Sequence, residues 1–289
     1  AGIANLPSTV GVGFTYVPFR QAFLEPPVVL SLIDNTNQEP AAIRIQNVTR
    51  NGFEVAQIEP GSGRATPDGN TPAIQVPYLA IEEGLYSLPS GLSIEVGSVA
   101  ITENVGRNVG ATTGYRAVPI DGGFINPVVI SQIQTTNNGV NSIGSSAFLT
   151  TVVNNVNDTS FNLALERSEV AIGSVDVAET VAYVVINSDI QFGLTDSADL
   201  SVALETLGVS NRTVRGDLVC NSMNLVNSYQ QAPLMFANKQ SREGGNGGWL
   251  RSCSPSTASV GVVLQEDWTD TDIYHVEEPV GALIIERPF

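Results

Sequence analysis

The sequence predicts an all-β fold of three tandem antiparallel β-sandwich modules with about six strands each. Three observations lead to this prediction. A short phrase that ends in proline and a hydrophobic run is written three times, apolar and polar residues alternate with a period of two, and Gly, Pro or Asn interrupts these runs at short intervals. Alternation of this kind is typical of strands with one buried face.

The repeated phrase sets the period of the modules. Its copies are Phe14–Phe19 with Phe23–Leu30, Tyr115–Ile120 with Phe124–Ile130, and a looser Met223–Val226 with Ala232–Phe236. Each copy contains a marker proline, namely Pro27, Pro127 and Pro233, and the markers follow one another at intervals of about 100 residues, the size of a small domain. We therefore expect modules at residues 1–100, 101–195 and 196–289.

The order of elements within a copy is also repeated. After the proline phrase come a polar loop, an alternating strand that ends in a turn, and two closing strands. These four parts lie at 34–37, 43–53, 54–59 and 78–81 in the first copy and at 135–139, 149–161, 162–166 and 183–186 in the second. The third copy has its strands at 249–253, 260–264 and 281–285. Asn51-Gly52 predicts a hairpin with a type I′ turn, because both residues tolerate positive φ.

The connections between modules are expected to be short. Residues 199–209 have apolar spacing that fits a helix as well as a strand, and we interpret them as a connector between the second and third modules. Segments 88–91 and 106–113 contain no long Pro, Ser or Thr stretch, so the modules should pack against each other. The apolar segments 3–17 and 280–289 predict chain ends held in a sheet of the same chain or of a neighbour.

The amino-acid composition indicates an exported protein and argues against two classes of binding partner. The net charge is −16 and Lys239 is the single lysine, which argues against binding to nucleic acid or to an anionic membrane surface. No apolar run approaches the roughly 18 residues of a membrane span. We expect a secreted or cell-surface protein whose signal peptide has been removed.

The two cysteines are predicted to form a disulfide. Cys220 precedes the first strand of the third module and Cys253 ends a later one, so two neighbouring strands could bring them together. The alternative is a pair of buried free thiols, because two cysteines are too few to prove an oxidising compartment.

Signatures of catalysis are scarce, and we expect no enzyme and no cofactor. His275 is the single histidine, which excludes metal sites built on several histidines, and no serine lies in a Gly-x-Ser-x-Gly turn. The acidic cluster 266–278 offers carboxylates for calcium, although its spacing does not match the twelve-residue calcium loop. The candidate metal ligands are Glu266, Asp267, Asp270 and Asp272. A solvated hairpin tip and a carboxylate pair for glycoside cleavage are the alternatives for this cluster.

The repeated phrase resembles a known family. Pro27–Leu30, Ala42–Val55 and Tyr78–Glu82 look like the H-type lectin domain, and more closely like its tandem copies in bacterial surface proteins associated with mannose-sensitive haemagglutinin-type pili. In the third copy the resemblance rests on Asn238–Arg242, Gly247–Cys253, Glu266-Asp267, Asp270, His275 and Glu278. It implies six-stranded sandwiches that assemble as trimers. With three copies joined in one chain, the modules could form a pseudo-trimer or line up as a rod.

The resemblance also implies glycan binding. Aromatic faces that could stack on a sugar ring and polar side chains that could bond to it occur together in the third module, and the candidates are Trp249, Arg251, Trp268, Asp270, Tyr274 and His275. Core packing beside the disulfide is the alternative for Trp249. We therefore expect an adhesive protein that binds glycans weakly through many copies, or else the subunit of an extracellular filament assembled by strand addition between chains.

Overall fold

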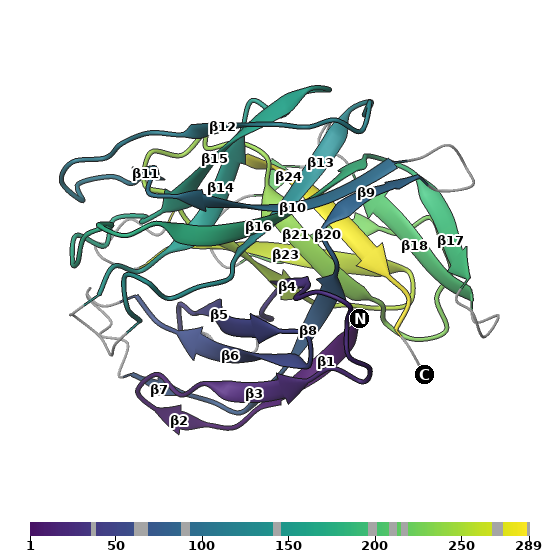
Figure 1. Ribbon diagram of the computed structural model, residues 1–289, viewed down its shortest axis with the longest axis horizontal. Helices are drawn as coiled ribbons and strands as arrows, with labels where there is room; N and C mark the ends of the chain where they lie inside the picture. Colours follow the sequence, from purple (N-terminus) through teal and green to yellow (C-terminus); the bar gives the residue numbers. More distant parts are fainter. Residues whose placement is uncertain are drawn as a thin grey trace.

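The computed structural model describes the chain except for residues 36–38, 61–68, 88–92, 141–145, 196–200, 208–212, 215–218, 268–273 and 288–289. Within the described ranges the chain forms strands and no helix, and the strands pair in antiparallel sheets apart from β11 beside β15 (Figure 1). The predicted all-β fold is therefore confirmed. Six of the sheets form three pairs, each pair sharing one apolar core, which we call the first, second and third sandwich.

The first sandwich encloses one apolar core between two three-stranded sheets. Its inner sheet contains β1 (Gly2–Leu6), β8 (Ile74–Ile81) and β4 (Val28–Ser31), and its outer sheet contains β3 (Thr15–Pro18), β6 (Gly52–Ile58) and β5 (Ala42–Thr49). A small ladder of β2 (Thr9–Val10) and β7 (Asn70–Thr71) extends from it. Val29, Phe53 and Val76 are among the core residues that the two sheets share.

The second sandwich begins before the predicted division of the chain. Its inner sheet contains β13 (Pro127–Ile133), β16 (Glu179–Asn187), β10 (Ser93–Ile101) and β9 (Gly84–Ser87), and its outer sheet contains β11 (Asn104–Val105), β15 (Ser160–Glu166), β12 (Arg116–Pro119) and β14 (Thr150–Asn154). The expected boundary after residue 100 thus falls inside β10. Residues 106–113 connect β11 and β12 within this sandwich and do not link two modules.

The third sandwich also includes one strand, β17, from before its expected start at residue 196. Its inner sheet contains β17 (Gln191–Thr195), β18 (Ser201–Leu207), β24 (Glu278–Ile285), β19 (Thr213–Val214) and β21 (Leu234–Lys239), and its outer sheet contains β20 (Asn221–Asn224), β23 (Ser259–Gln265) and β22 (Trp249–Cys253). The described part of the expected connector, residues 201–207, is strand β18 paired with β17 and β24. Both apolar end segments contribute strands to sheets of the same chain, since β1 pairs with β8 and β24 with β21 in inner sheets and β3 pairs with β6 in an outer sheet.

The hairpin at Asn51-Gly52 exists, but its turn differs from the type I′ prediction. Thr49 pairs with Gly52 across the turn, and the residue with positive φ is Asn47, at 50°. Asn155 and Ser254, directly after β14 and β22 of the other two sandwiches, adopt φ values of 50° and 45°. Gly52 is required for space, because a Cβ there would lie 2.4 Å from the carbonyl oxygen of Val17.

The disulfide between Cys220 and Cys253 is confirmed, with a Cα–Cα distance of 5.9 Å. The two cysteines do not lie on neighbouring strands as predicted, because β23 lies between β20 and β22. The sulfur atoms instead cross over Gly261 of β23, where an added Cβ would lie 2.5 Å from Sγ of Cys220. A glycine at this position leaves the space that the crossing needs.

The three inner sheets pack against each other around a common centre (Figure 1). One apolar cluster contains Leu30 of β4, Ile130 of β13 and Phe236 of β21 together with residues of β8, β10, β16 and β24. Each sandwich therefore buries a second face against its neighbours, and the three form one body. Figure 1 shows the first sandwich in purple and blue, the second from blue (β9 and β10) to teal, and the third in green and yellow.

The edge strands β4, β13 and β21 meet at the centre, and two of the three edges are closed in the same way. Gln134, seven residues after Pro127, accepts a hydrogen bond from the backbone N–H of Val29 at 2.9 Å and donates one to its carbonyl at 2.8 Å. Gln240, seven residues after Pro233, makes the same two bonds to Val129, each at 2.9 Å. We call each arrangement a glutamine clamp.

The third junction, between the third and first sandwiches, is built differently. Asp34 occupies the position seven residues after Pro27. At this position the chain is no longer paired with β8. Pro77 has no N–H to donate at the place where the ladder between β4 and β8 would continue. Residues 33–35 instead bond to Ser252 of β22, and Leu32 packs into the core of the third sandwich.

Candidate functional site

In the sequence, most of the predicted glycan and calcium residues fall between β23 and β24, and Trp249 and Arg251 belong to β22. Trp268, Asp270 and Asp272 are outside the described residues. On one side of that segment are Glu266 and Asp267, which are buried, and on the other side is Tyr274, whose side chain is 69% exposed. Tyr274 is therefore the one described aromatic candidate that faces solvent.

The two acids before the segment are engaged within the protein. Glu266 accepts a hydrogen bond from the side-chain amide of Asn246 at 2.8 Å, and Asp267 accepts one from the backbone N–H of Glu169 in the second sandwich at 2.7 Å. Within the described ranges, no group of three or more His, Cys, Asp or Glu side chains is placed to hold a metal ion. Calcium at this loop stays a prediction.

Trp249 and Arg251 are structural parts of the junctions between sandwiches. The Trp249 ring packs on Phe148 of the second sandwich at 4.7 Å between centroids and donates from Nε1 to the carbonyl of Ala41 in the first at 2.8 Å. Arg251 donates to the carbonyls of Asp34 and Glu39, at 2.7 Å to each, and burial lowers its pKa to about 10. Both side chains are buried, which argues against contact with a glycan.

His275 is buried beside Glu278. Its Nδ1 lies 2.8 Å from the carbonyl oxygen of Val276, and its Nε2 lies 3.7 Å from Oε1 of Glu278. Gly244 leaves room for the imidazole, because a Cβ there would be 2.2 Å from the ring. Burial, followed by the nearby charge of Lys239, lowers the pKa of His275, so the folded state favours the neutral ring.

Two buried carboxylates, those of Glu278 and Glu166, bind the loop that follows β21. Glu278 accepts hydrogen bonds from the hydroxyl of Ser241 and from the backbone N–H groups of Glu243 and Gly244, between 2.8 and 3.0 Å. Glu166 of the second sandwich pairs with Arg242 at 2.7 Å. The first two sandwiches are joined by a similar buried pair, Arg44 and Glu179, at 3.5 Å. These charges hold loops and junctions and do not face an open cleft.

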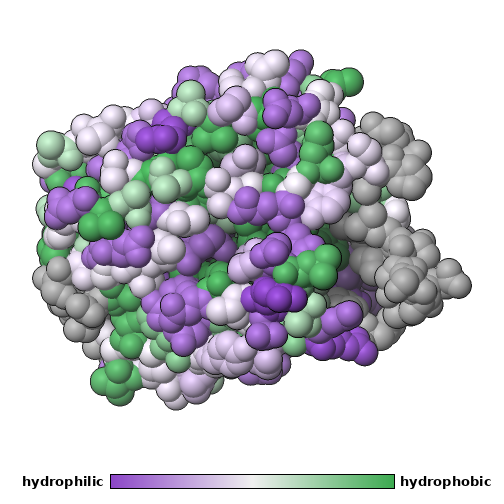
Figure 2. Space-filling view, in the orientation of Figure 1, coloured by the Kyte–Doolittle hydropathy of each residue, from purple (hydrophilic) through white to green (hydrophobic). Residues whose placement is uncertain are grey.

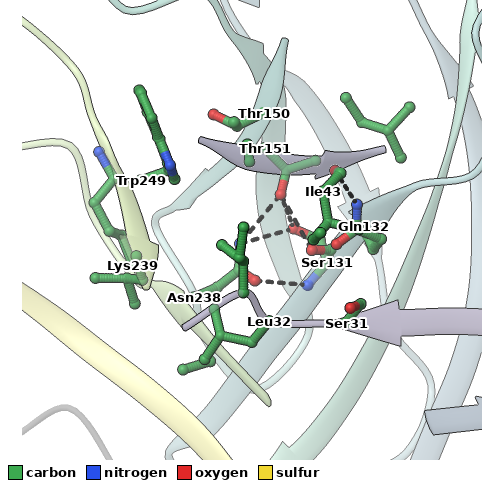
Figure 3. A pocket seen from close by; sticks show the side chains of 15 residues that line it. Ser31, Leu32, Ile43, Ser131, Gln132, Thr150, Thr151, Asn238, Lys239 and Trp249 are labelled. Carbon is green, nitrogen blue, oxygen red and sulfur yellow. Dashed lines mark hydrogen bonds between the residues drawn. The ribbon is translucent and has the colours of Figure 1, made fainter. Parts of the chain in front are cut away.

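A small cavity lies where the three edge strands converge (Figure 3). Equivalent residues of the three copies line it, for example Ser31, Ser131 and Ala237, each four residues after its marker proline. Figure 3 shows Asn238 bonded to Ser131 and Thr151 across this space. Its volume of about 60 Å³ has room for a few water molecules, but a sugar ring does not fit.

Lys239 lines the same cavity and is fully buried. Within the described residues its Nζ has no hydrogen-bond partner, and burial lowers its pKa despite the nearby Glu166 and Glu278. The matching residues six positions after the other marker prolines are Ile33 and Ile133. Neither Lys239 nor the clamp glutamines was recognised from the sequence, although comparing positions at a fixed distance from the marker prolines would have singled them out.

The surface shown in Figure 2 mixes hydrophilic and hydrophobic residues, with apolar side chains in small scattered groups. One exposed apolar residue recurs in the loop before each central edge strand. These residues are Leu24, Ile125 and Val226, with exposed fractions of 77%, 72% and 65%. The same loop is thus presented three times on one body.

Comparison with known proteins adds one relative. The chain is 24% identical over 279 residues to halomucin of Haloquadratum walsbyi (strain DSM 16790 / HBSQ001), in an alignment that covers 93% of this chain and 3% of halomucin. The chain therefore spans a small part of the length of that protein. No family model matches the sequence, and no solved structure matches the chain. Within the described ranges, no helix is long and apolar enough to cross a membrane.

Proposed function

We propose that this chain is a non-enzymatic adhesive protein of the cell surface or extracellular space, with H-type lectin-like repeats that bind glycans weakly and gain strength from multivalency. One observation carries the proposal: three sandwiches that share an apolar cluster present the equivalent loop, before the central edge strand, three times, each time with an exposed apolar residue. Presentation in several copies raises avidity without any single deep pocket.

The location outside the cell has three supports. The Cys220–Cys253 disulfide is stable in an oxidising environment, the net charge of −16 favours solubility, and the chain is similar to a protein whose name likens it to a mucin. The chain covers a small share of halomucin, so the activity of that whole protein is not transferred.

The loop between β23 and β24 is the place where we expect the glycan to bind. Tyr274 offers an exposed ring, and Trp268 and Asp270 belong to the same segment of sequence. A sugar bound on this surface would stack on an aromatic face and bond to carboxylates and amides of the loop. The buried Trp249 and Arg251 would act only by stabilising the junctions between the sandwiches.

A glycan array with and without calcium tests this proposal. We expect weak signals that increase when the protein is displayed in many copies, and that fall for Tyr274→Ala and Trp268→Ala. Val10→Ala, another exposed apolar residue but distant in sequence, serves as the matched control. An array at background level under every condition, for folded and multivalent protein, would rule out the glycan function.

A filament subunit is the second candidate, and one strand favours it. β9 is an edge strand whose four residues are all exposed, including Leu85 and Tyr86. Such an edge can accept a strand from another chain. Size-exclusion chromatography and negative-stain images of purified protein at neutral pH distinguish the two candidates. Filaments that disappear in Leu85→Lys would favour the subunit, and discrete particles favour the adhesive protein.

A further inference from the structure

We propose that the junction between the third and first sandwiches is a binding site for a primary carboxamide, carried by a small solute or by a glutamine side chain of a partner protein. This inference is independent of glycan binding. It rests on a comparison of the three junctions, two of which already hold a carboxamide from the chain itself.

The glutamine clamps define the chemistry of the site. In each clamp the primary amide turns one N–H and its carbonyl oxygen to the same residue, and so satisfies both backbone groups of Val29 or Val129. These backbone groups point away from their own sheets, because alternate residues of an edge strand bond to the neighbouring strand and the others do not. A single carboxamide thus closes an edge that would otherwise be unpaired.

Met235 holds the equivalent position in β21, two residues after Pro233. Gln240 donates its backbone N–H to Pro279, so residues 234, 236 and 238 bond to β24 and Met235 directs its N–H and carbonyl to the open edge. Within the described part of the chain, no group is hydrogen-bonded to Met235 on that side, although the residue is only 4% exposed. Buried backbone groups without partners are costly, which favours a ligand that supplies them.

A cavity of about 260 Å³ lies directly against this edge. It is lined by Leu234 and Met235 of β21 and by Ser252, Gln75 and Arg287. Asp34 also lines it, at the sequence position that the clamp glutamine occupies in the other two copies. Leu32 lies five residues after its marker proline, as Gln132 and Asn238 do in the other copies. Its side chain packs into the apolar core of the third sandwich and makes no polar bond to the edge of β21. The cavity is therefore mixed in polarity and larger than the one at the centre of the molecule.

The geometry selects among amides. A primary amide presents a donor and an acceptor on one side, as the two clamps do. An N-substituted trans amide presents its N–H and its carbonyl in opposite directions and can satisfy only one group of Met235. A carboxylate can accept from the N–H but leaves the carbonyl unpaired. The site should therefore prefer butyramide to N-methylbutyramide and to butyrate.

The sequence offers a built-in control for the test. Methionine occurs twice, at Met223 of β20 and Met235 of β21, so protein labelled with ¹⁵N-methionine gives two backbone amide signals. Met223→Leu assigns them. On titration with butyramide we expect the Met235 signal to shift with saturation and the Met223 signal to stay in place. N-methylbutyramide and butyrate should bind at least tenfold more weakly.

Two further arms complete the experiment. The tripeptide Gly-Gln-Gly tests a glutamine side chain as the source of the carboxamide, against free butyramide. Asp34→Gln, which introduces the missing clamp residue, should reduce the response of Met235 to butyramide at least tenfold. If this variant does not fold, the comparison of the three small probes on the unmodified protein still decides.

Several results would overturn the inference. These are an unmoved Met235 signal at the highest butyramide concentration, equal shifts with butyrate or N-methylbutyramide, or equal movement of Met223. A Met235 signal that changes with protein concentration alone would show that a second copy of the chain covers the edge, and would also refute the carboxamide site. None of these outcomes depends on the glycan array.

Discussion

The side-chain amide of Gln134 bonds to both backbone groups of Val29, across the junction between two sandwiches. This contact links sequence positions that are 105 residues apart. Because both partners are buried, the bonds are shielded from water and the edge of β4 is closed to other strands. The clamp therefore contributes to stability and also prevents unwanted pairing.

Gln134→Glu tests the clamp with the smallest change in shape. The carboxylate cannot donate to the Val29 carbonyl and introduces a buried charge, so we expect a loss of about 3 kcal/mol or more in the free energy of unfolding. Urea unfolding at pH 7 measures it, with the exposed Gln230→Glu as the matched control. The loss should decrease at pH 5, where a raised pKa protonates the new side chain. Equal stability of both variants would contradict the clamp.

Because the disulfide crosses over Gly261, we expect a side chain at this position to destabilise the protein. Gly261→Ala places a Cβ against both sulfur atoms and should destabilise the oxidised protein by about 2 kcal/mol or more. In a Cys220→Ala, Cys253→Ala background one source of crowding is gone, so the same substitution should cost less. A double-mutant cycle by thermal unfolding gives the coupling energy. Additive effects would show that the sulfur atoms do not restrict residue 261.

Much of the fold could be predicted from the sequence because strand formation depends on local pattern. Alternation, turn residues and the repeated proline phrase predicted an all-β protein, and the cysteine pair was predicted correctly. The turn after β5 was predicted less well. Asn51-Gly52 fits a type I′ turn in isolation, but the structure places positive φ at Asn47, and space beside Val17 explains the glycine.

The candidate site was harder to predict, because the same type of side chain can bind a ligand at the surface or bond to a neighbouring sandwich at a junction. Trp249 and Arg251 have the chemistry of sugar-binding residues, yet here they bond to carbonyls of the first sandwich. Their roles depend on how three sandwiches pack together, a contact between residues more than 200 positions apart. Gln134 and Gln240 were overlooked for the same reason, since nothing near them in sequence marks them as partners of Val29 and Val129.

We expect protonation of His275 to reduce the stability of the protein in mild acid. Its pKa is lowered in the folded state, so the unfolded chain binds the proton more readily. Its contribution is therefore fully present above the unfolded pKa of about 6.5 and is lost as pH falls below that value. Unfolding followed from pH 8 to pH 5 should show a decline that is smaller in His275→Gln. An identical decline in the variant would assign it to the carboxylates.

Lys239 predicts a gain of stability on substitution. Burial lowers its pKa, so the charged form is disfavoured in the folded protein, and the penalty persists at every pH below the unfolded pKa of about 10.4. Lys239→Met keeps the length of the side chain and removes the charge, at a position where the other copies have Ile33 and Ile133. We expect about 1 kcal/mol of added stability at pH 7. The difference from the natural protein should shrink as pH rises toward 10.5, because the unfolded lysine also becomes neutral. A destabilised variant with no such pH trend would mean that attraction to Glu166 and Glu278 outweighs the cost of burying the ammonium group.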